Sequence, residues 1–219
     1  MKKNVLISGA MNKSGMAIAK AFRKEGFYVY GLDKKEDYES ICDRSFRFNL
    51  EEFVSNADYR IRFTQIFDEI IPNLNVLVNN EEVVFEGRLN EVQLEQWQQS
   101  INVNLTGPMM LCKFFLNRLE KSKGSIVNII NLSSQKEIEG GISYYTSRMA
   151  LLQLTKAMAI DLKEKVRVNS ICFDPYRKNQ RGVHGEIKEE KLSNEIGRLS
   201  AILSMEEVGY LSGENINLG

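Results

Sequence analysis

Tyr144 and Arg148 are the residues whose types and spacing point most directly to chemistry. They stand four apart at the start of an apolar-periodic stretch that reaches about Leu162, so one helix would carry both side chains on the same face. A phenol has an ordinary pKa of about 10, and a fixed cation beside it favours the phenolate. The pair therefore predicts an acid/base for interconverting a carbonyl and an alcohol. The alternative is a tyrosine at the core edge beside a surface arginine.

Short apolar runs alternate with helix-period segments along the chain, which is typical of an α/β fold. Strands are expected at residues 5–7, 27–32, 46–50, 76–78, 126–130, 166–171 and 215–218. Helices are expected after Gly15, at residues 63–70, 94–119, 144–162 and 192–203, and residues 174–190 are polar and irregular. The pattern predicts a doubly wound parallel sheet in three α/β/α layers. No repeat or linker interrupts it, so residues 1–219 are expected to form a single domain.

Composition excludes several classes of partner. The 29 basic and 29 acidic residues cancel, which removes any overall attraction to nucleic acid or an anionic membrane. The first apolar run is too short for a signal peptide or a membrane span. Three widely spaced cysteines without a CxxC motif indicate a reducing, cytoplasmic setting and no metal site. The only histidine, His184, lies in a polar stretch and is expected to be solvated.

The segment from Val5 to Phe22 reads as strand, turn and helix, the unit that holds a dinucleotide pyrophosphate on backbone N–H groups. Gly9 and Gly15 would supply the tight turn. Asp33 follows Gly15 by 18 residues at the end of the next strand, where a carboxylate binds the adenosine ribose and favours NAD over NADP. Lys13, Lys34 and Lys35 favour NADP instead, as partners for a 2′-phosphate. NAD is the preferred prediction, and the alternative for Asp33 is an ordinary turn residue.

Several ordered motifs make almost the whole chain resemble the short-chain dehydrogenase/reductase family. They are Ser8-Gly9-Ala10, Asn79-Asn80, Trp97 with Asn102-Val103-Asn104-Leu105-Thr106-Gly107, Gly124 to Ile129, Tyr144 with Ser147, Arg167 to Ile171, and Leu211-Ser212-Gly213. Each alone is unspecific, but the ordered set at this spacing is typical of the family. The resemblance implies a Rossmann fold and hydride transfer between a nicotinamide cofactor and a carbonyl or alcohol.

The resemblance also implies roles for single residues. Tyr144 would be the acid/base, Asn104 would hold a relay water, and Arg148 would grip the nicotinamide ribose and tune the tyrosine. Asn131 stands where the family has a serine that binds the substrate carbonyl, with Ser133 or Ser134 as alternatives if the loop slides. The cofactor-binding residues would be Gly9, Asn12, Lys13, Gly15, Asp33, Asn49 in the adenine pocket, Asn79 and Asn80.

The chain also departs from the family at these places. Lys13 replaces a glycine of the turn, and Arg148 replaces the lysine that usually follows the tyrosine by four. The family's Asn-Asn-Ala-Gly becomes Asn79-Asn80-Glu81-Glu82, two anions beside the expected cofactor. One like-charge contact at ~4 Å costs about 1 kcal/mol in water and ~4 kcal/mol at an effective dielectric of 20. The segment that usually closes over the substrate is shorter by roughly fifteen residues.

Two functions remain open on the sequence. One is an oxidoreductase of a small carbonyl or alcohol, impaired by weak cofactor binding, and the other is a non-catalytic family member that binds a nucleotide weakly or interacts with proteins. Helices 94–119 and 144–162 carry more apolar residues than one sheet face needs. These residues predict a homodimer or homotetramer. The alternative is that they only form the hydrophobic core of a single chain. The sequence names no substrate.

Overall fold

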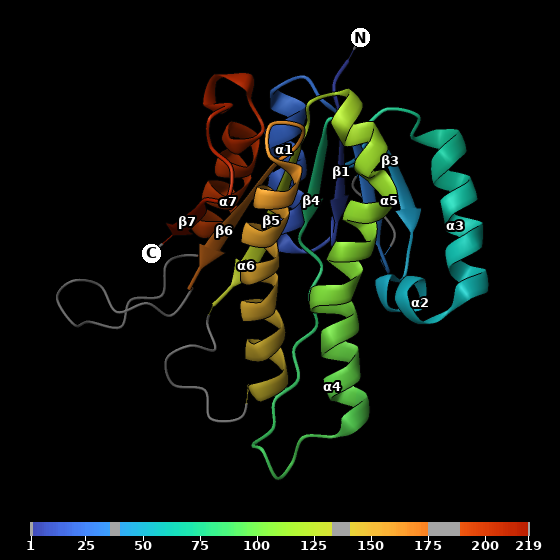
Figure 1. Cartoon of the computed structure of the whole chain (residues 1–219), viewed down its shortest axis with the longest axis vertical. Coiled ribbons are helices and arrows are strands. Elements are labelled where there is room, and N and C mark those ends of the chain that lie inside the picture. Colours follow the sequence, from blue (N-terminus) through green and yellow to red (C-terminus); the bar gives the residue numbers. More distant parts are fainter. Residues whose placement is uncertain (1, 36–39, 133–140, 175–188, 219) are drawn as a thin grey trace, which may run out of the picture.

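The structure, a computed structural model, describes residues 2–35, 40–132, 141–174 and 189–218. Its centre is a seven-stranded parallel sheet of order β3-β2-β1-β4-β5-β6-β7 (Figure 1). The strands are β1 (Asn4–Ser8), β2 (Tyr28–Asp33), β3 (Arg44–Arg47), β4 (Val76–Asn79), β5 (Ser125–Asn131), β6 (Arg167–Phe173) and β7 (Asn215–Leu218). The chain reverses its direction of winding between β1 and β4, so a crevice is expected at their carboxyl ends.

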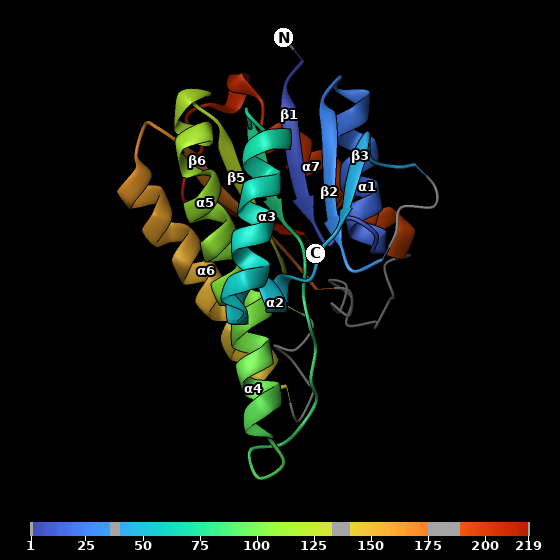
Figure 2. The ribbon, with the colours of Figure 1, turned by 90° about the vertical axis from the view of Figure 1, so that its right-hand side faces the viewer.

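Helices cover both faces of the sheet (Figure 2). They are α1 (Lys13–Lys24), α2 (Leu50–Ser55), α3 (Ala57–Ile70), α4 (Leu94–Ile101), α5 (Gly107–Lys121), α6 (Ile142–Leu162) and α7 (Glu189–Leu203), with a 3₁₀ turn η3 (Glu206–Val208). Successive residues of a strand point to opposite faces, so Val5 and Ile7 pack under α1 and α7 while Leu6 packs under α3, α5 and α6. The predicted doubly wound, three-layer sheet is confirmed.

Two predicted elements differ from the observed ones. The third strand ends at Arg47 rather than residue 50, because the Asn49 side chain accepts hydrogen bonds from Glu51 N and Glu52 N at 3.1 and 3.4 Å and starts α2. The helix expected at 94–119 is α4 and α5 joined by a π-helical turn η1 (Asn102–Thr106). The wider turn is typical of functional sites, and it holds Asn104 fully buried.

The residues that the structure describes also bear on membrane spans, metal sites and cysteines. No helix among these residues is long and apolar enough to cross a bilayer. They hold no group of three or more His, Cys, Asp or Glu side chains placed to bind a metal ion. Cys42, Cys112 and Cys172 are buried. His184, Ser133, Ser134 and most of the 174–190 segment lie outside the described residues.

Candidate active site

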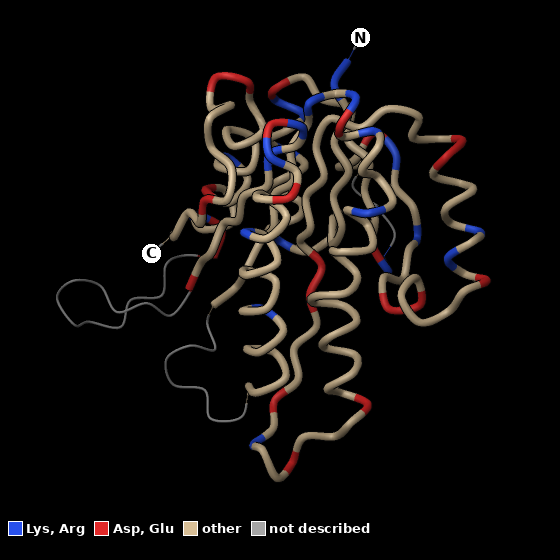
Figure 3. The backbone as a smooth tube through the Cα atoms, viewed as in Figure 1, with Lys and Arg blue, Asp and Glu red and all other residues tan. Residues whose placement is uncertain are grey.

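The candidate site lies where the carboxyl ends of β1, β4 and β5 meet. The Gly9 turn follows β1, Glu81 and Glu82 follow β4, and Asn131 ends β5. Figure 3 shows the acidic stretch on the segment that leaves β4, near the middle of the molecule. Tyr144 reaches this edge from the first turn of α6. The topology therefore gathers the predicted catalytic tyrosine and the predicted cofactor turn at one crevice.

Tyr144 is 2% exposed, and its hydroxyl is engaged by the chain itself. It donates to Glu82 Oε2 at 2.7 Å, with the Asn131 carbonyl oxygen also within reach at 3.2 Å. The Arg148 guanidinium carbon lies 6.0 Å from the Tyr144 ring centroid. The structure thus brings Tyr144 and Arg148 together as predicted from their spacing. It also adds a partner, Glu82, which was expected only to repel the cofactor.

The pKa of the Tyr144 phenol is raised overall in this conformation, opposite to the effect expected from Arg148 alone. Burial raises the pKa of the phenol well above its ordinary value, and the Glu82 carboxylate raises it further. Arg148 lowers the pKa of Tyr144, but its effect is smaller than that of burial. The prediction that the Arg148 cation lowers the pKa of Tyr144 holds in direction, but burial outweighs it and the pKa is raised overall.

Arg148 is a buried cation with an incomplete set of partners. It is 2% exposed, donates from one amino group to the Ile129 carbonyl, and lies 3.5 Å from Glu82 Oε2. Within the described residues, its Nε has no hydrogen-bond partner. A buried charge without a counter-ion is strongly destabilising, so Glu82 is needed to balance Arg148.

Asn104 holds the segment that carries Glu82. Its side-chain oxygen accepts from Val83 N at 2.9 Å, and its amide donates to Val83 O at 2.9 Å and to Ser147 Oγ at 3.0 Å. The Asn104 side chain thus bonds both the N–H and the carbonyl of Val83, as the backbone of a neighbouring strand would. The relay-water role that the resemblance assigns to Asn104 stays a prediction.

The predicted turn residues form a connected unit between β1, α1 and β4. Asn12 caps α1 by accepting from Gly15 N at 2.7 Å, and Asn80 donates to Gly9 O at 2.8 Å and to Asn12 Oδ1 at 3.0 Å. A Cβ on Gly15 would lie 2.0 Å from Gly9 O, so only glycine fits there. The turn is therefore built as tightly as phosphate binding requires.

The other predicted cofactor residues are more dispersed. Asp33 accepts from Met11 N at 2.8 Å and from Lys35 N at 2.9 Å, so it faces the Gly9 turn. Asn79 donates to Asn128 Oδ1 at 2.8 Å inside the core, and Lys13 pairs with Glu189 of α7 at the surface. Asn49, besides capping α2, lines a pocket of about 410 Å³. That pocket also contains Lys34, Arg47 and Arg62.

Glu81 lies against the Gly9 turn. Gly9 has φ +65°, and a Cβ built there would be 2.8–2.9 Å from Glu81 N, Cα and Oε2. Burial, with the nearby Asp33 carboxylate as the next cause, raises the pKa of Glu81 from 4.5 to about 7. Glu81 thus packs against Gly9 through both its backbone and its carboxyl group.

The raised pKa of Glu81 predicts how stability depends on pH. A carboxyl whose pKa is higher in the folded state takes up a proton on folding between pH 4.5 and about 7. The stabilisation that comes from this proton uptake is complete below pH 4.5 and is lost as pH rises through about 7. We expect the unfolding free energy of the wild type, relative to Glu81→Gln, to fall by on the order of 2–3 kcal/mol across that range. Urea unfolding of both proteins measures it, and a difference that is constant with pH contradicts the assignment.

Taken together, the residues at this edge fit a nicotinamide dinucleotide only in part. The Gly9–Gly15 turn and Asp33 are suitably placed for a pyrophosphate and a ribose. Glu81 covers Gly9, however, and Glu82 occupies both Tyr144 and Arg148. Both carboxyl groups thus lie at the edge of the sheet where the dinucleotide is expected.

The missed feature is the pairing of Glu82 with Tyr144 and Arg148. The departures at 82 and 148 were both visible in the sequence, as a glycine replaced by an acid and a lysine replaced by an arginine. Their opposite charges are the signal that could have indicated a contact. Spacing alone could not, because the two positions are 66 residues apart and meet only through the sheet.

Comparison with known proteins shows the family to which the chain belongs. The family model for short chain dehydrogenases matches residues 3–178. Meso-2,3-butanediol dehydrogenase of Serratia marcescens is 28% identical, with 98% of this chain and 92% of that protein aligned. Glucose 1-dehydrogenase 2 of Bacillus subtilis is 27% identical over 98% and 92% of the two chains. A Brucella ovis oxidoreductase of the short chain dehydrogenase/reductase family, solved with a partially ordered NAD, superimposes with a TM-score of 0.81 at 23% identity and full coverage of both chains. The chain belongs to the short-chain dehydrogenase/reductase family of oxidoreductases.

Proposed function

We propose that this protein interconverts a small alcohol and its carbonyl compound with a nicotinamide dinucleotide, and that cofactor binding is weak because Glu81 and Glu82 must first leave the site. The observation that carries the proposal is the position of Tyr144, whose hydroxyl lies at the carboxyl edge of the sheet near the Gly9 turn. Once Glu82 has moved away, Tyr144 can exchange its proton with a substrate oxygen. The related dehydrogenases, which act on small alcohols or sugars by name, support this reaction class.

NAD is the proposed cofactor. Asp33 faces the Gly9 turn, where its carboxylate suits ribose hydroxyls and opposes a 2′-phosphate. The Brucella ovis structure, which contains NAD, also supports this choice. NADP remains the alternative, because Lys34, Arg47 and Arg62 line the neighbouring pocket and would suit a phosphate.

A non-catalytic role is the second candidate, and one observation favours it. Glu82 satisfies the Tyr144 hydroxyl and balances Arg148, so the two groups needed for chemistry are used to stabilise the fold. A protein that has lost turnover can keep such a contact without cost. In that case the chain would act as a weak nucleotide-binding or interaction subunit.

Titration of the wild type with NAD⁺, NADH, NADP⁺ and NADPH, followed by turnover assays on small alcohols and carbonyls, tests the proposal. We expect NAD⁺ and NADH to bind weakly and turnover to be slow. If neither the wild type nor a variant lacking both glutamates binds any of the four nicotinamide forms, only the non-catalytic candidate remains.

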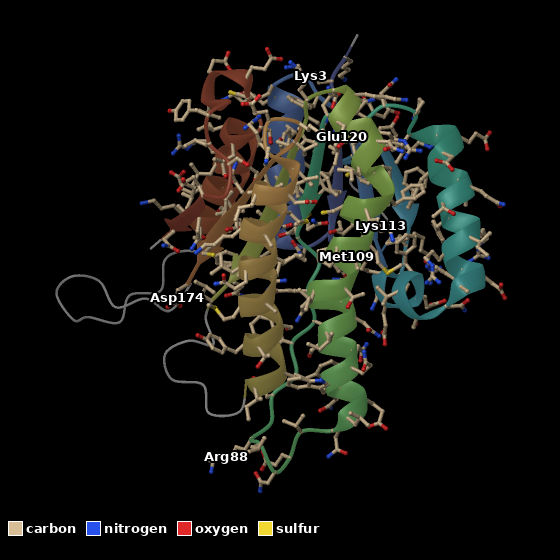
Figure 4. All side chains as sticks on the ribbon, in the orientation of Figure 1. Lys3, Arg88, Met109, Lys113, Glu120 and Asp174 are labelled. Carbon is tan, nitrogen blue, oxygen red and sulfur yellow. The ribbon has the colours of Figure 1, made fainter. Side chains whose placement is uncertain are left out.

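A homodimer or homotetramer through helices 94–119 and 144–162 is proposed as the assembled form. Exposed apolar side chains on these helices support it: Leu94, Met109, Tyr145 and Ile160. Figure 4 shows Met109 on α5, which lies beside α6. Sedimentation velocity tests the proposal, and a monomer at all concentrations opposes it. The three cysteines, which are all buried, support the proposed reducing, cytoplasmic setting.

A further inference from the structure

The Glu82 carboxylate occupies a site formed by two buried side chains. Its Oε2 accepts from the Tyr144 hydroxyl at 2.7 Å and lies 3.5 Å from an Arg148 amino nitrogen. Tyr144 and Arg148 are each 2% exposed, whereas the Glu82 side chain is 27% exposed. Glu82 is therefore the most exposed member of the three.

Arg148 is only partly satisfied by this arrangement. Its guanidinium can meet a carboxylate with two parallel N–H···O bonds, but Glu82 offers one oxygen at a long distance. The Nε atom has no partner within the described part of the chain, although Arg148 is almost completely buried. A carboxylate that is not tethered to the backbone at position 82 has the freedom to approach this unused donor.

Glu82 can leave without unfolding its surroundings. The next residue, Val83, is fixed through its own N–H and carbonyl by Asn104, so a rotation of the Glu82 side chain leaves that anchor intact. Arg148 cannot then stay buried and unpaired, because an uncompensated buried charge is strongly destabilising. An anion that replaces Glu82 would restore this balance.

We propose that Tyr144 and Arg148 form a binding site for the carboxylate group of a small organic acid, and that Glu82 fills this site when no ligand is bound. The binding site needs neither cofactor nor turnover, so it does not rest on the proposed oxidoreductase function.

Chemical rescue of Glu82→Ala tests the site. Removing the carboxylate leaves Arg148 unpaired and opens space, so formate, the smallest carboxylate, should bind and stabilise the folded state. We expect the melting temperature of Glu82→Ala to be roughly 4–7 °C higher in formate than in chloride at the same concentration, with saturation. An equal melting temperature in the two salts overturns the proposal.

Three controls separate binding from general salt effects. Glu206→Ala removes the same carboxylate from the exposed pair with Lys3, and it should show no preference for formate. Glu82→Gln keeps the space filled and should also show none. Glu82→Ala with Tyr144→Phe lacks the hydroxyl donor and should show a smaller shift than Glu82→Ala. An equal formate effect in Glu206→Ala overturns the proposal.

A second variant covers poor folding of Glu82→Ala. Glu82→Gly, which carries the residue that the resembled family has at this position, is refolded from urea in formate and in chloride. A higher folded yield in formate supports the site, and equal yields overturn it. Loss of turnover in the wild type would refute the oxidoreductase function without touching either result.

Discussion

Replacing Glu81 by alanine and Glu82 by glycine together will tighten NADH binding about 5-fold to 1,000-fold over the wild type. Glu81 covers Gly9 and Glu82 occupies Tyr144 and Arg148, so the dinucleotide must displace both carboxyl groups. A single like-charge contact at ~4 Å is worth about 1 kcal/mol in water and ~4 kcal/mol at an effective dielectric of 20. Since each 1.4 kcal/mol is about tenfold in affinity, the stated range follows. Isothermal titration calorimetry measures the effect.

The matched control removes a neighbouring pair of glutamates elsewhere. Glu206 and Glu207 lie in η3, away from the crevice, and Glu206 pairs with Lys3. Alanine at both positions changes the net charge by the same two units, so it reports any general electrostatic effect on an anionic ligand. NADH affinity should change little. An equal gain in both double variants would show that the Glu81–Glu82 segment does not compete with the cofactor, and tight binding by the wild type would show that it moves away easily.

The sheet and most of its helices could be predicted from the sequence because they depend on local patterns. Val5-Leu6-Ile7 and Val76-Leu77-Val78 are short apolar runs, and a parallel strand buried on both faces needs just that composition. The end of β3 was missed because Asn49 competes for the backbone through its side chain, which hydropathy does not report. The π-helical turn at residues 102–106 was missed for a similar reason, since one wider turn leaves the apolar period almost unchanged.

The residues of the site were predicted better than their interactions. Tyr144 and Arg148 share a helix, so spacing was enough to bring them together. Glu82 reaches them from the end of another strand, and its effect on both depends on burial. The same holds for Glu81, whose raised pKa comes first from desolvation. Charge patterns in a sequence do not reveal desolvation, which explains why the raised pKa of Tyr144 was not predicted.

Substitution of Tyr144 by phenylalanine is expected to lower turnover by about 10²- to 10⁴-fold, the range typical of a lost general acid/base. The comparison is made in the variant lacking Glu81 and Glu82, where the phenol is free to meet a substrate oxygen. NADH affinity should stay within a few-fold, because Tyr144→Phe leaves Arg148 and the Gly9 turn unchanged. Rates at saturating NADH, together with calorimetric affinities, separate the two effects.

Tyr145 provides the control at the neighbouring position. It lies on the same turn of α6 but is exposed, so Tyr145→Phe removes an identical hydroxyl without touching the crevice. The two phenols also differ in ionisation, since burial and Glu82 raise the pKa of Tyr144. Removing Glu82 takes away one of these causes and leaves Arg148 without its counter-ion. The pKa of Tyr144, measured from the pH profile of turnover, should therefore be lower in Glu82→Gly than in the wild type. Turnover that survives Tyr144→Phe unchanged would remove this tyrosine from the reaction, and Tyr144 would then be a structural partner of the Glu82–Arg148 pair.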